Sequence, residues 1–118
     1  MHSLKKDIII KLSMIPLLQG MENNNIIVMT SAGTYTGKIF SDEDDAPEIA
    51  LPFVNVLSEL ADQYRQDNHI DKNTLLDGND GYLILKDVQL RTNGPIINMP
   101  FVVLFFDQIV GISIGNEV

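Results

Sequence analysis

The sequence has no cysteine and no long apolar run. Without cysteine the chain cannot form disulfides, thiolate zinc sites or a thiol nucleophile, and it is compatible with a reducing compartment. No window approaches the uninterrupted apolar length of a transmembrane helix. Near the N-terminus, Asp7 and Lys11 interrupt the apolar residues that would otherwise resemble a signal peptide. We therefore expect a cytoplasmic protein that does not enter a membrane.

Basic residues are also scarce. Eight Lys and Arg stand against 16 Asp and Glu, so the formal net charge is -8. The long-range interaction with nucleic acid or an anionic membrane surface is then repulsive, although the net charge does not exclude a local basic patch.

Few residues suit catalysis. His2 and His69 are the only histidines, and each lies in a polar context typical of a surface residue. The Gly37-Lys38 pair lies inside a predicted hairpin and lacks the strand, loop and helix of a phosphate-binding loop. We expect no enzymatic activity and no cofactor.

Five carboxylates are concentrated in one stretch: Asp42, Glu43, Asp44, Asp45 and Glu48. Such a set is chemically suited to a hard cation such as calcium. It lacks the alternating ligand spacing and the central glycine of a calcium loop, so we interpret it as a solvated acidic loop and predict no metal site.

The stretch 26–40 has the pattern of a β-hairpin. Its first half is apolar and β-branched, Ala32 and Gly33 form a two-residue break, and its second half alternates between the two faces of a strand. Gly37 lies inside the second predicted strand. Glycine at such a place typically marks a bulge or bend where two backbones approach closely.

Two segments have helical periodicity. In the first, Ser3 suits the N-cap position, Pro16 should end or kink the helix, and the isoleucines 8–10 leave a strand as the alternative. Four apolar residues fall on one stripe of this helix: Leu4, Ile8, Leu12 and Ile15.

The second segment, 50–66, has the stronger helical pattern, and Pro52 suits its first turn. Its apolar residues recur at helical spacing: Phe53, Val56, Leu57, Leu60, Ala61 and Tyr64.

Residues 82–91 have the pattern of a strand whose apolar positions change face. The apolar residues change from odd-numbered to even-numbered positions between Leu85 and Val88. We therefore expect a bulge or bend near Lys86 and Asp87.

Two further strands are predicted at 101–106 and 109–114, after a turn at 92–95. Both are apolar on both parities, so both of their faces need covering, either by the rest of the fold or by another subunit.

Together, the five strands, the N-terminal helix and the glycine placement resemble the Sm and Sm-like small-barrel superfamily. The resemblance is carried by residues 28–39 with 83–88, and by residues 102–114, which are similar to the family's closing strand pair. It implies one domain, mainly β with α: a small, strongly bent five-stranded antiparallel barrel with an N-terminal helix. The helix between strands two and three, within about 41–81, is then an insertion.

The residues by which members of this superfamily bind RNA are replaced. Tyr82 stands where an asparagine is usual, and Phe106-Asp107 stand where an arginine-glycine pair is usual. An RNA site would have to use the basic residues on the predicted strands together with a stacking aromatic: Lys38, Tyr82, Lys86 and Arg91. The alternative is that these aromatics belong to the core and these cations are ordinary surface charges.

Sm-like barrels pair the edges of their fourth and fifth strands between neighbours to form rings. The resemblance therefore implies a homo-oligomer, and we expect a non-enzymatic, self-associating scaffold or interaction module, with a divergent RNA-binding protein as the alternative. The candidate interface residues are Phe101, Val103, Phe105, Ile109 and Ile112.

Overall fold

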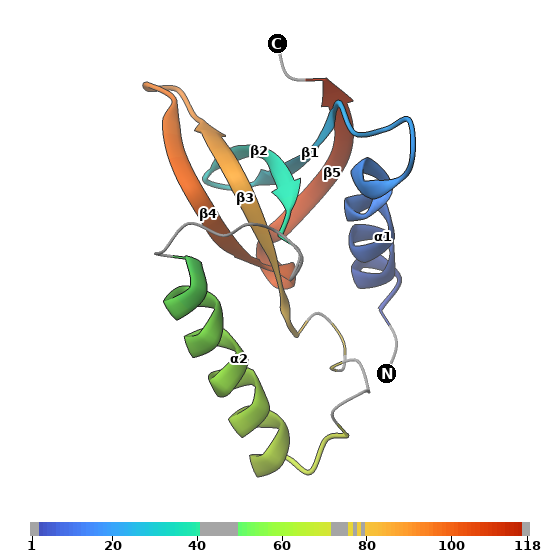
Figure 1. Ribbon diagram of the computed structural model, residues 1–118, viewed down its shortest axis with the longest axis vertical. Helices are drawn as coiled ribbons and strands as arrows, with labels where there is room; N and C mark the ends of the chain where they lie inside the picture. Colours follow the sequence, from blue (N-terminus) through green and yellow to red (C-terminus); the bar gives the residue numbers. More distant parts are fainter. Residues whose placement is uncertain (1–2, 41–49, 72–75, 77, 79, 117–118) are drawn as a thin grey trace. The chain divides into compact units, whose positions relative to one another are not determined.

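The computed structural model describes residues 3–40, 50–71, 76, 78 and 80–116 (Figure 1). The chain divides into a sheet unit, residues 1–41 with 77–118, and a helical unit, residues 42–76. The helical unit falls within the predicted insertion 41–81.

The elements follow one another in this order: helix α1 (Leu4–Ser13), 3₁₀ helix η1 (Ile15–Leu17), strands β1 (Asn24–Thr30) and β2 (Gly33–Ile39), helix α2 (Ala50–Asp67), strands β3 (Tyr82–Arg91) and β4 (Ile97–Phe105), 3₁₀ helix η2 (Phe106–Gln108) and strand β5 (Ile109–Asn116).

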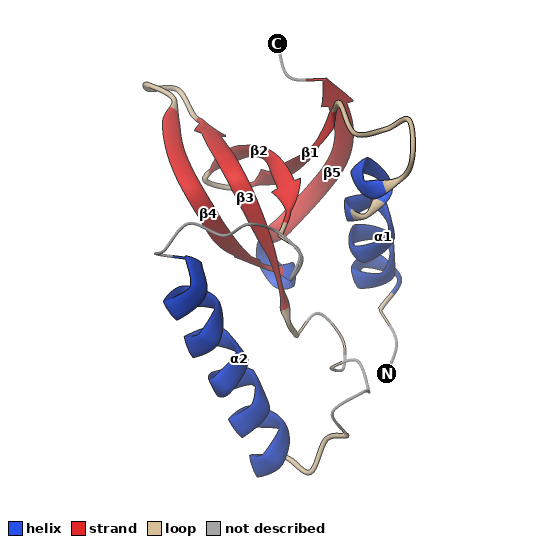
Figure 2. Cartoon of the chain, viewed as in Figure 1, coloured by secondary structure: helices blue, strands red, loops and turns tan. Residues whose placement is uncertain are grey.

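The five strands form one antiparallel sheet in the order β4-β3-β2-β1-β5 (Figure 2). The predicted mixture of a five-stranded antiparallel sheet with an N-terminal helix and an inserted helix is confirmed. The sheet stays open, with β4 and β5 as its two edges, so the predicted closure into a five-stranded barrel is not confirmed.

The hairpin of β1 and β2 turns one residue earlier than predicted. Thr30 pairs with Gly33, so Ser31 and Ala32 form the turn. The Thr30 hydroxyl stabilises this turn, since it accepts a hydrogen bond from the Ala32 amide and donates one to the Gly33 carbonyl. Gly33 instead begins β2, where a Cβ atom would lie 2.7 Å from the Arg91 carbonyl oxygen.

The bulge predicted from the parity change in β3 is confirmed, and it lies opposite Gly37. The register between β2 and β3 shifts between Thr36 and Lys38, and Asp87 has a positive φ of 52°. Because of this extra residue, apolar side chains from both parities of β3 are buried on one face of the sheet: Leu83, Leu85, Val88 and Leu90.

Strand β4 begins earlier than predicted, at Ile97, and includes Pro100. Proline has no amide hydrogen, so it is confined to edge strands and bulges. Pro100 meets both conditions, because β4 is an edge and the paired positions on either side of Pro100 flank Asp87 on β3.

Helix α1 begins as predicted, with the Ser3 hydroxyl accepting a hydrogen bond from the Lys6 amide, and it ends before Pro16. Its buried residues, however, are Lys6, Ile9 and Ser13, not the predicted apolar stripe. Leu4 and Ile8 of that stripe are exposed. Helical spacing places residues on a common side of a helix, but it does not say which neighbour covers that side.

Lys6 is a charged residue beside the core. Its ammonium lies 5.4 Å from the centroid of the Phe106 ring, and its aliphatic stem is buried with the helix face. A cation over an aromatic ring is attracted by the ring's quadrupole, which offsets part of the cost of removing the charge from water.

The core of the sheet unit lies between α1 and one face of the sheet. Its buried residues come from α1, from β1, β3, β4 and β5, and from η2: Ile9, Ile26, Val28, Leu83, Leu85, Val88, Leu104, Phe106 and Ile109. Tyr35 and Ile39 of β2 pack against this cluster on the same side as Gly37.

The helical unit contains α2, whose bounds agree with the predicted helix 50–66. Val56, Leu60 and Tyr64 on its predicted apolar stripe are exposed. The Arg65 guanidinium, in the last turn of α2, donates a hydrogen bond to the carbonyl of Asp71, which follows the helix. Among the described residues, no helix has the length and apolar character needed to cross a bilayer.

The close approach at Gly37 can be tested by adding a methyl group. A Cβ atom on Gly37 would lie 2.8 Å from the Lys86 carbonyl oxygen, which is backbone and cannot move aside alone. We expect Gly37→Ala to lower the free energy of unfolding by about 1 to 3 kcal/mol in urea denaturation. Gly94→Ala, at an exposed position with only the Thr92 hydroxyl nearby, is the control and should change stability by less than about 0.5 kcal/mol.

Candidate functional site

The candidate site is formed by the two open edges of the sheet. Strand β4 pairs only with β3, and β5 pairs only with β1 among the residues that the structure describes. Each edge therefore presents backbone N–H and C=O groups on its outer side. Such a row is a template on which another strand can pair.

The two edges lack the charged side chains by which edge strands often avoid pairing. Neither INMPFVVLF of β4 nor IVGISIGN of β5 contains a charged residue. Pro100 occupies a single position of β4, and a bulge at Val110 interrupts β5, so each edge has one local obstacle to pairing. Phe105 and Val110 are the most exposed large apolar side chains of the two strands, with 54% and 74% of their surface accessible.

The five predicted interface residues have different environments. Phe105 is exposed, Phe101 and Val103 are half-buried, and Ile112 is half-buried against the core. Ile109 is a core residue with 1% of its surface accessible.

Val110 is an interface candidate that the sequence interpretation missed. The pairing of β1 with β5 shifts register between Met29 and Thr30, whose partners are Gly111 and Ile109, so Val110 is the extra residue of a bulge. An uninterrupted apolar run gives no sign of which residue such a bulge turns outward. The adjacent glycine at position 111 was the available signal.

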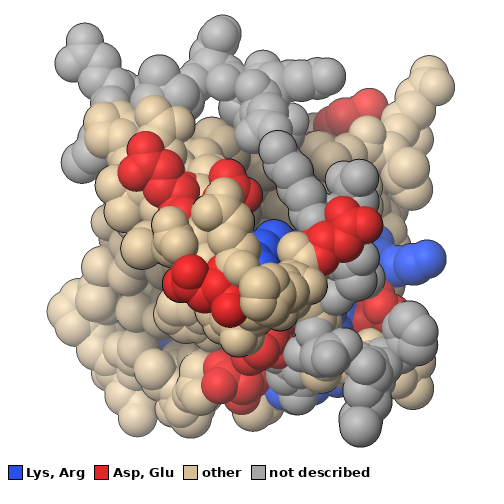
Figure 3. Space-filling model, turned by 90° about the horizontal axis from the view of Figure 1, so that it is seen from below, with Lys and Arg blue, Asp and Glu red and all other residues tan. Residues whose placement is uncertain are grey.

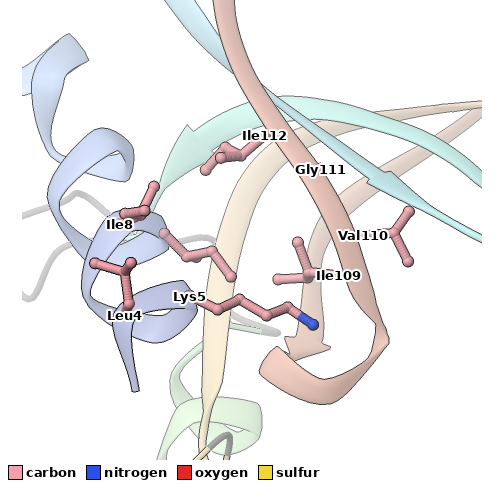
Figure 4. Close-up of a pocket in the computed structure, with 8 residues that line it drawn as sticks. Leu4, Lys5, Ile8, Ile109, Val110, Gly111 and Ile112 are labelled. Carbon is pink, nitrogen blue, oxygen red and sulfur yellow. The ribbon is translucent and has the colours of Figure 1, made fainter. Parts of the chain in front are cut away.

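An apolar groove of about 580 Å³ runs between α1 and the first residues of β5 (Figure 4). Its α1 wall is formed by Leu4, Lys5, Ile8 and Ile9, and its strand wall is formed by Ile109, Val110, Gly111 and Ile112. Ile109 and Ile112 point toward the helix, whereas Val110 points to the opposite side of the strand (Figure 4). The stripe residues Leu4 and Ile8 therefore line this groove.

The predicted RNA-binding residues do not all lie together. Lys38 of β2 is paired directly with Lys86 of β3, and Lys86 is paired with Phe101 of β4. These three residues therefore form a row across one face of the sheet. The Lys38 ammonium donates a short hydrogen bond to the Glu22 carbonyl.

Tyr82 and Arg91 lie at the two ends of β3, about 30 Å apart if the strand is fully extended. The Tyr82 ring packs edge to face on Phe105, with ring centroids 6.4 Å apart. Arg91 lines a polar hollow beside the β1–β2 turn with Ser31, Thr34 and Thr92.

The acidic stretch 42–48 lies outside the described residues. Within the part of the chain that is described, no three His, Asp or Glu side chains are grouped as metal ligands would be. Acidic side chains are scattered over the face shown in Figure 3, where few basic ones are visible.

Comparisons with protein-family models, with curated proteins and with solved structures found no match to this chain.

Phe105 and Phe106 are neighbours in the chain, but Phe105 is exposed at the sheet edge and Phe106 is buried in the core. Phe106 has 3% of its surface accessible, so Phe106→Ala should lower the free energy of unfolding by about 3 to 5 kcal/mol. Phe105→Ala removes an exposed ring and its contact with Tyr82, and it should cost about 1 kcal/mol or less. Urea denaturation of the two variants measures this difference. Equal losses would contradict the assignment of Phe105 to the surface.

Proposed function

We propose that this chain is a non-enzymatic, Sm-like interaction module that self-associates through its sheet edges. In this assembly β4 of one copy pairs with β5 of the next. The observation that carries the proposal is the chemistry of the two edges, which are unpaired on their outer sides, free of charged residues and furnished with exposed apolar side chains.

The strand order supports the same reading. The resemblance to Sm-like barrels implies that the fourth and fifth strands join neighbouring subunits, and β4 and β5 are the two edges of this sheet. A contact between two different edges is heterologous, so it repeats from copy to copy. It closes into a ring if the rotation between copies allows closure, and otherwise it forms a filament.

Antiparallel addition brings the two exposed apolar residues together. All four strand pairs of the sheet are antiparallel, and we extend that arrangement across the junction. The C-terminal end of β4 then meets the N-terminal end of β5. Phe105 and Val110 stand at these two ends, and Phe105 lies on the face of β4 that points away from the core.

Because the chain has no cysteine, the junction can be mapped by engineered disulfides. We expect wild-type mass to increase between low and high micromolar concentration in analytical ultracentrifugation. Under mild oxidation the double variant Phe105→Cys, Val110→Cys should give a ladder of cross-linked dimers, trimers and larger species.

Each single cysteine variant alone is the control, and it should give at most a minor dimer, because a head-to-tail junction does not bring identical positions together. A wild-type protein that remains monomeric throughout would contradict the proposal. A ladder that ends in one closed species would identify a ring and give its subunit number.

A second candidate function, RNA binding, is favoured by the row formed by Lys38, Lys86 and Phe101. Two neighbouring cations beside an aromatic ring can contact a phosphate and stack a base.

This second function is tested by fluorescence anisotropy of labelled oligo-U and oligo-A at low salt. If the row binds RNA, Lys38→Ala with Lys86→Ala should abolish binding, whereas Lys11→Ala, on the exposed surface of α1, should change it little. Wild-type binding should also weaken as salt increases. Absence of wild-type binding at high protein concentration would exclude this function.

A further inference from the structure

We infer that α1 is part of the junction between copies: the groove between α1 and β5 receives the core-facing side of strand β4 from a second copy. The inference rests on the proposed self-association and extends it. It assigns an occupant to a groove whose helix wall, Leu4 and Ile8, is apolar and exposed.

The first step concerns the two apolar sides of α1. Ile9 is buried in the core, whereas Leu4 and Ile8 have 76% and 44% of their surface accessible and face the groove (Figure 4). Large apolar side chains gathered on one surface mark an interaction site more often than scattered ones do. One apolar side of α1 is therefore covered within the chain, and the other is exposed to solvent.

The second step concerns the position of the groove. Its strand wall is the beginning of β5, from Ile109 to Ile112, which is also the edge offered for pairing. Ile112 is paired with the buried Val28, so it lies on the core face of the sheet. A strand that pairs with this edge continues the core face, and its side chains on that face lie against α1.

The third step identifies which part of β4 enters. Antiparallel addition places the C-terminal half of β4 along the first residues of β5. Val102 is paired with the buried Leu85, so it lies on the core face of β4, where one part of its surface packs against its own core and the rest is accessible. Val102 of the second copy is therefore the side chain expected nearest Leu4 and Ile8.

The fourth step is charge complementarity at the end of the groove. Lys5 lines the groove with its stem, and its ammonium extends toward the start of β5 (Figure 4). Asp107 follows β4 by two residues and is exposed. With β4 of the second copy antiparallel to β5, Asp107 of that copy comes to the end of the groove where Lys5 lies. A second copy thus supplies an apolar strand, and its Asp107 adds a carboxylate near the start of β5, where the chain's own Asp107 also precedes the strand by two residues.

The apolar wall is tested with the double variant Leu4→Ser, Ile8→Ser. Both residues are exposed in the single chain, so the unfolding midpoint should change little, while the association constant should fall by more than about tenfold. The matched control is Leu17→Ser, Leu18→Ser, which removes two exposed leucines outside the groove and should leave association unchanged.

The results separate this inference from the proposed function. A wild-type protein that stays monomeric contradicts both. A wild-type protein that associates, with a Leu4, Ile8 double variant that associates equally well, contradicts only the role of α1.

The identity of the occupant is tested by charge reversal. Lys5→Asp and Asp107→Lys should each weaken association several-fold, and the variant that carries both substitutions should recover most of the wild-type association constant. Recovery in the double variant, and likewise in an equimolar mixture of the two single variants, identifies a second copy as the occupant, because in the mixture the two reversed charges are on different chains. Weakening by Lys5→Asp without recovery in the mixture would overturn the inference, because Lys5 would then contribute to association through a group other than Asp107 of a second copy.

Discussion

The core depends on one local constraint, the bulge at which Gly37 of β2 meets Asp87 of β3. The register shifts here, and a side chain at position 37 would collide with the Lys86 carbonyl. Without the extra residue, Leu83 and Leu85 would lie on one face of the sheet and Val88 and Leu90 on the other. With it, all four are buried together. Gly37 of β2 and the parity change in β3 therefore act together, and as a result the open sheet has a single buried face.

A single open sheet leaves two edges on which another strand can pair. Charged side chains along an edge normally prevent pairing with another chain. Here 20% of the residues are charged, yet the edge strands β4 and β5 contain none. The central strand β1 also contains none, so the lack of charge supports the proposed contact between copies only together with the exposed apolar side chains of the edges.

The same reasoning applies to α1. Lys6, with its ammonium over the Phe106 ring, lies on the buried side of the helix, whereas Leu4 and Ile8 lie on the accessible side. In a monomer this arrangement exposes apolar surface to water, which is unfavourable. In an assembly the exposed stripe becomes a second packing surface, and the helix is apolar where a neighbour would meet it.

The sequence by itself determined the elements, because propensity, capping and turn chemistry act over a few residues. The N-cap at Ser3, the bounds of β3 and α2 and the bulge near Asp87 were all predicted. Only the tertiary structure decided which sides of those elements are covered. The stripe of Leu4 and Ile8 proved to line a groove, Ile109 proved to be a core residue, and Val110 proved to be exposed. These outcomes depend on strand order and register between residues far apart in the chain, and periodicity along one segment carries no information about either.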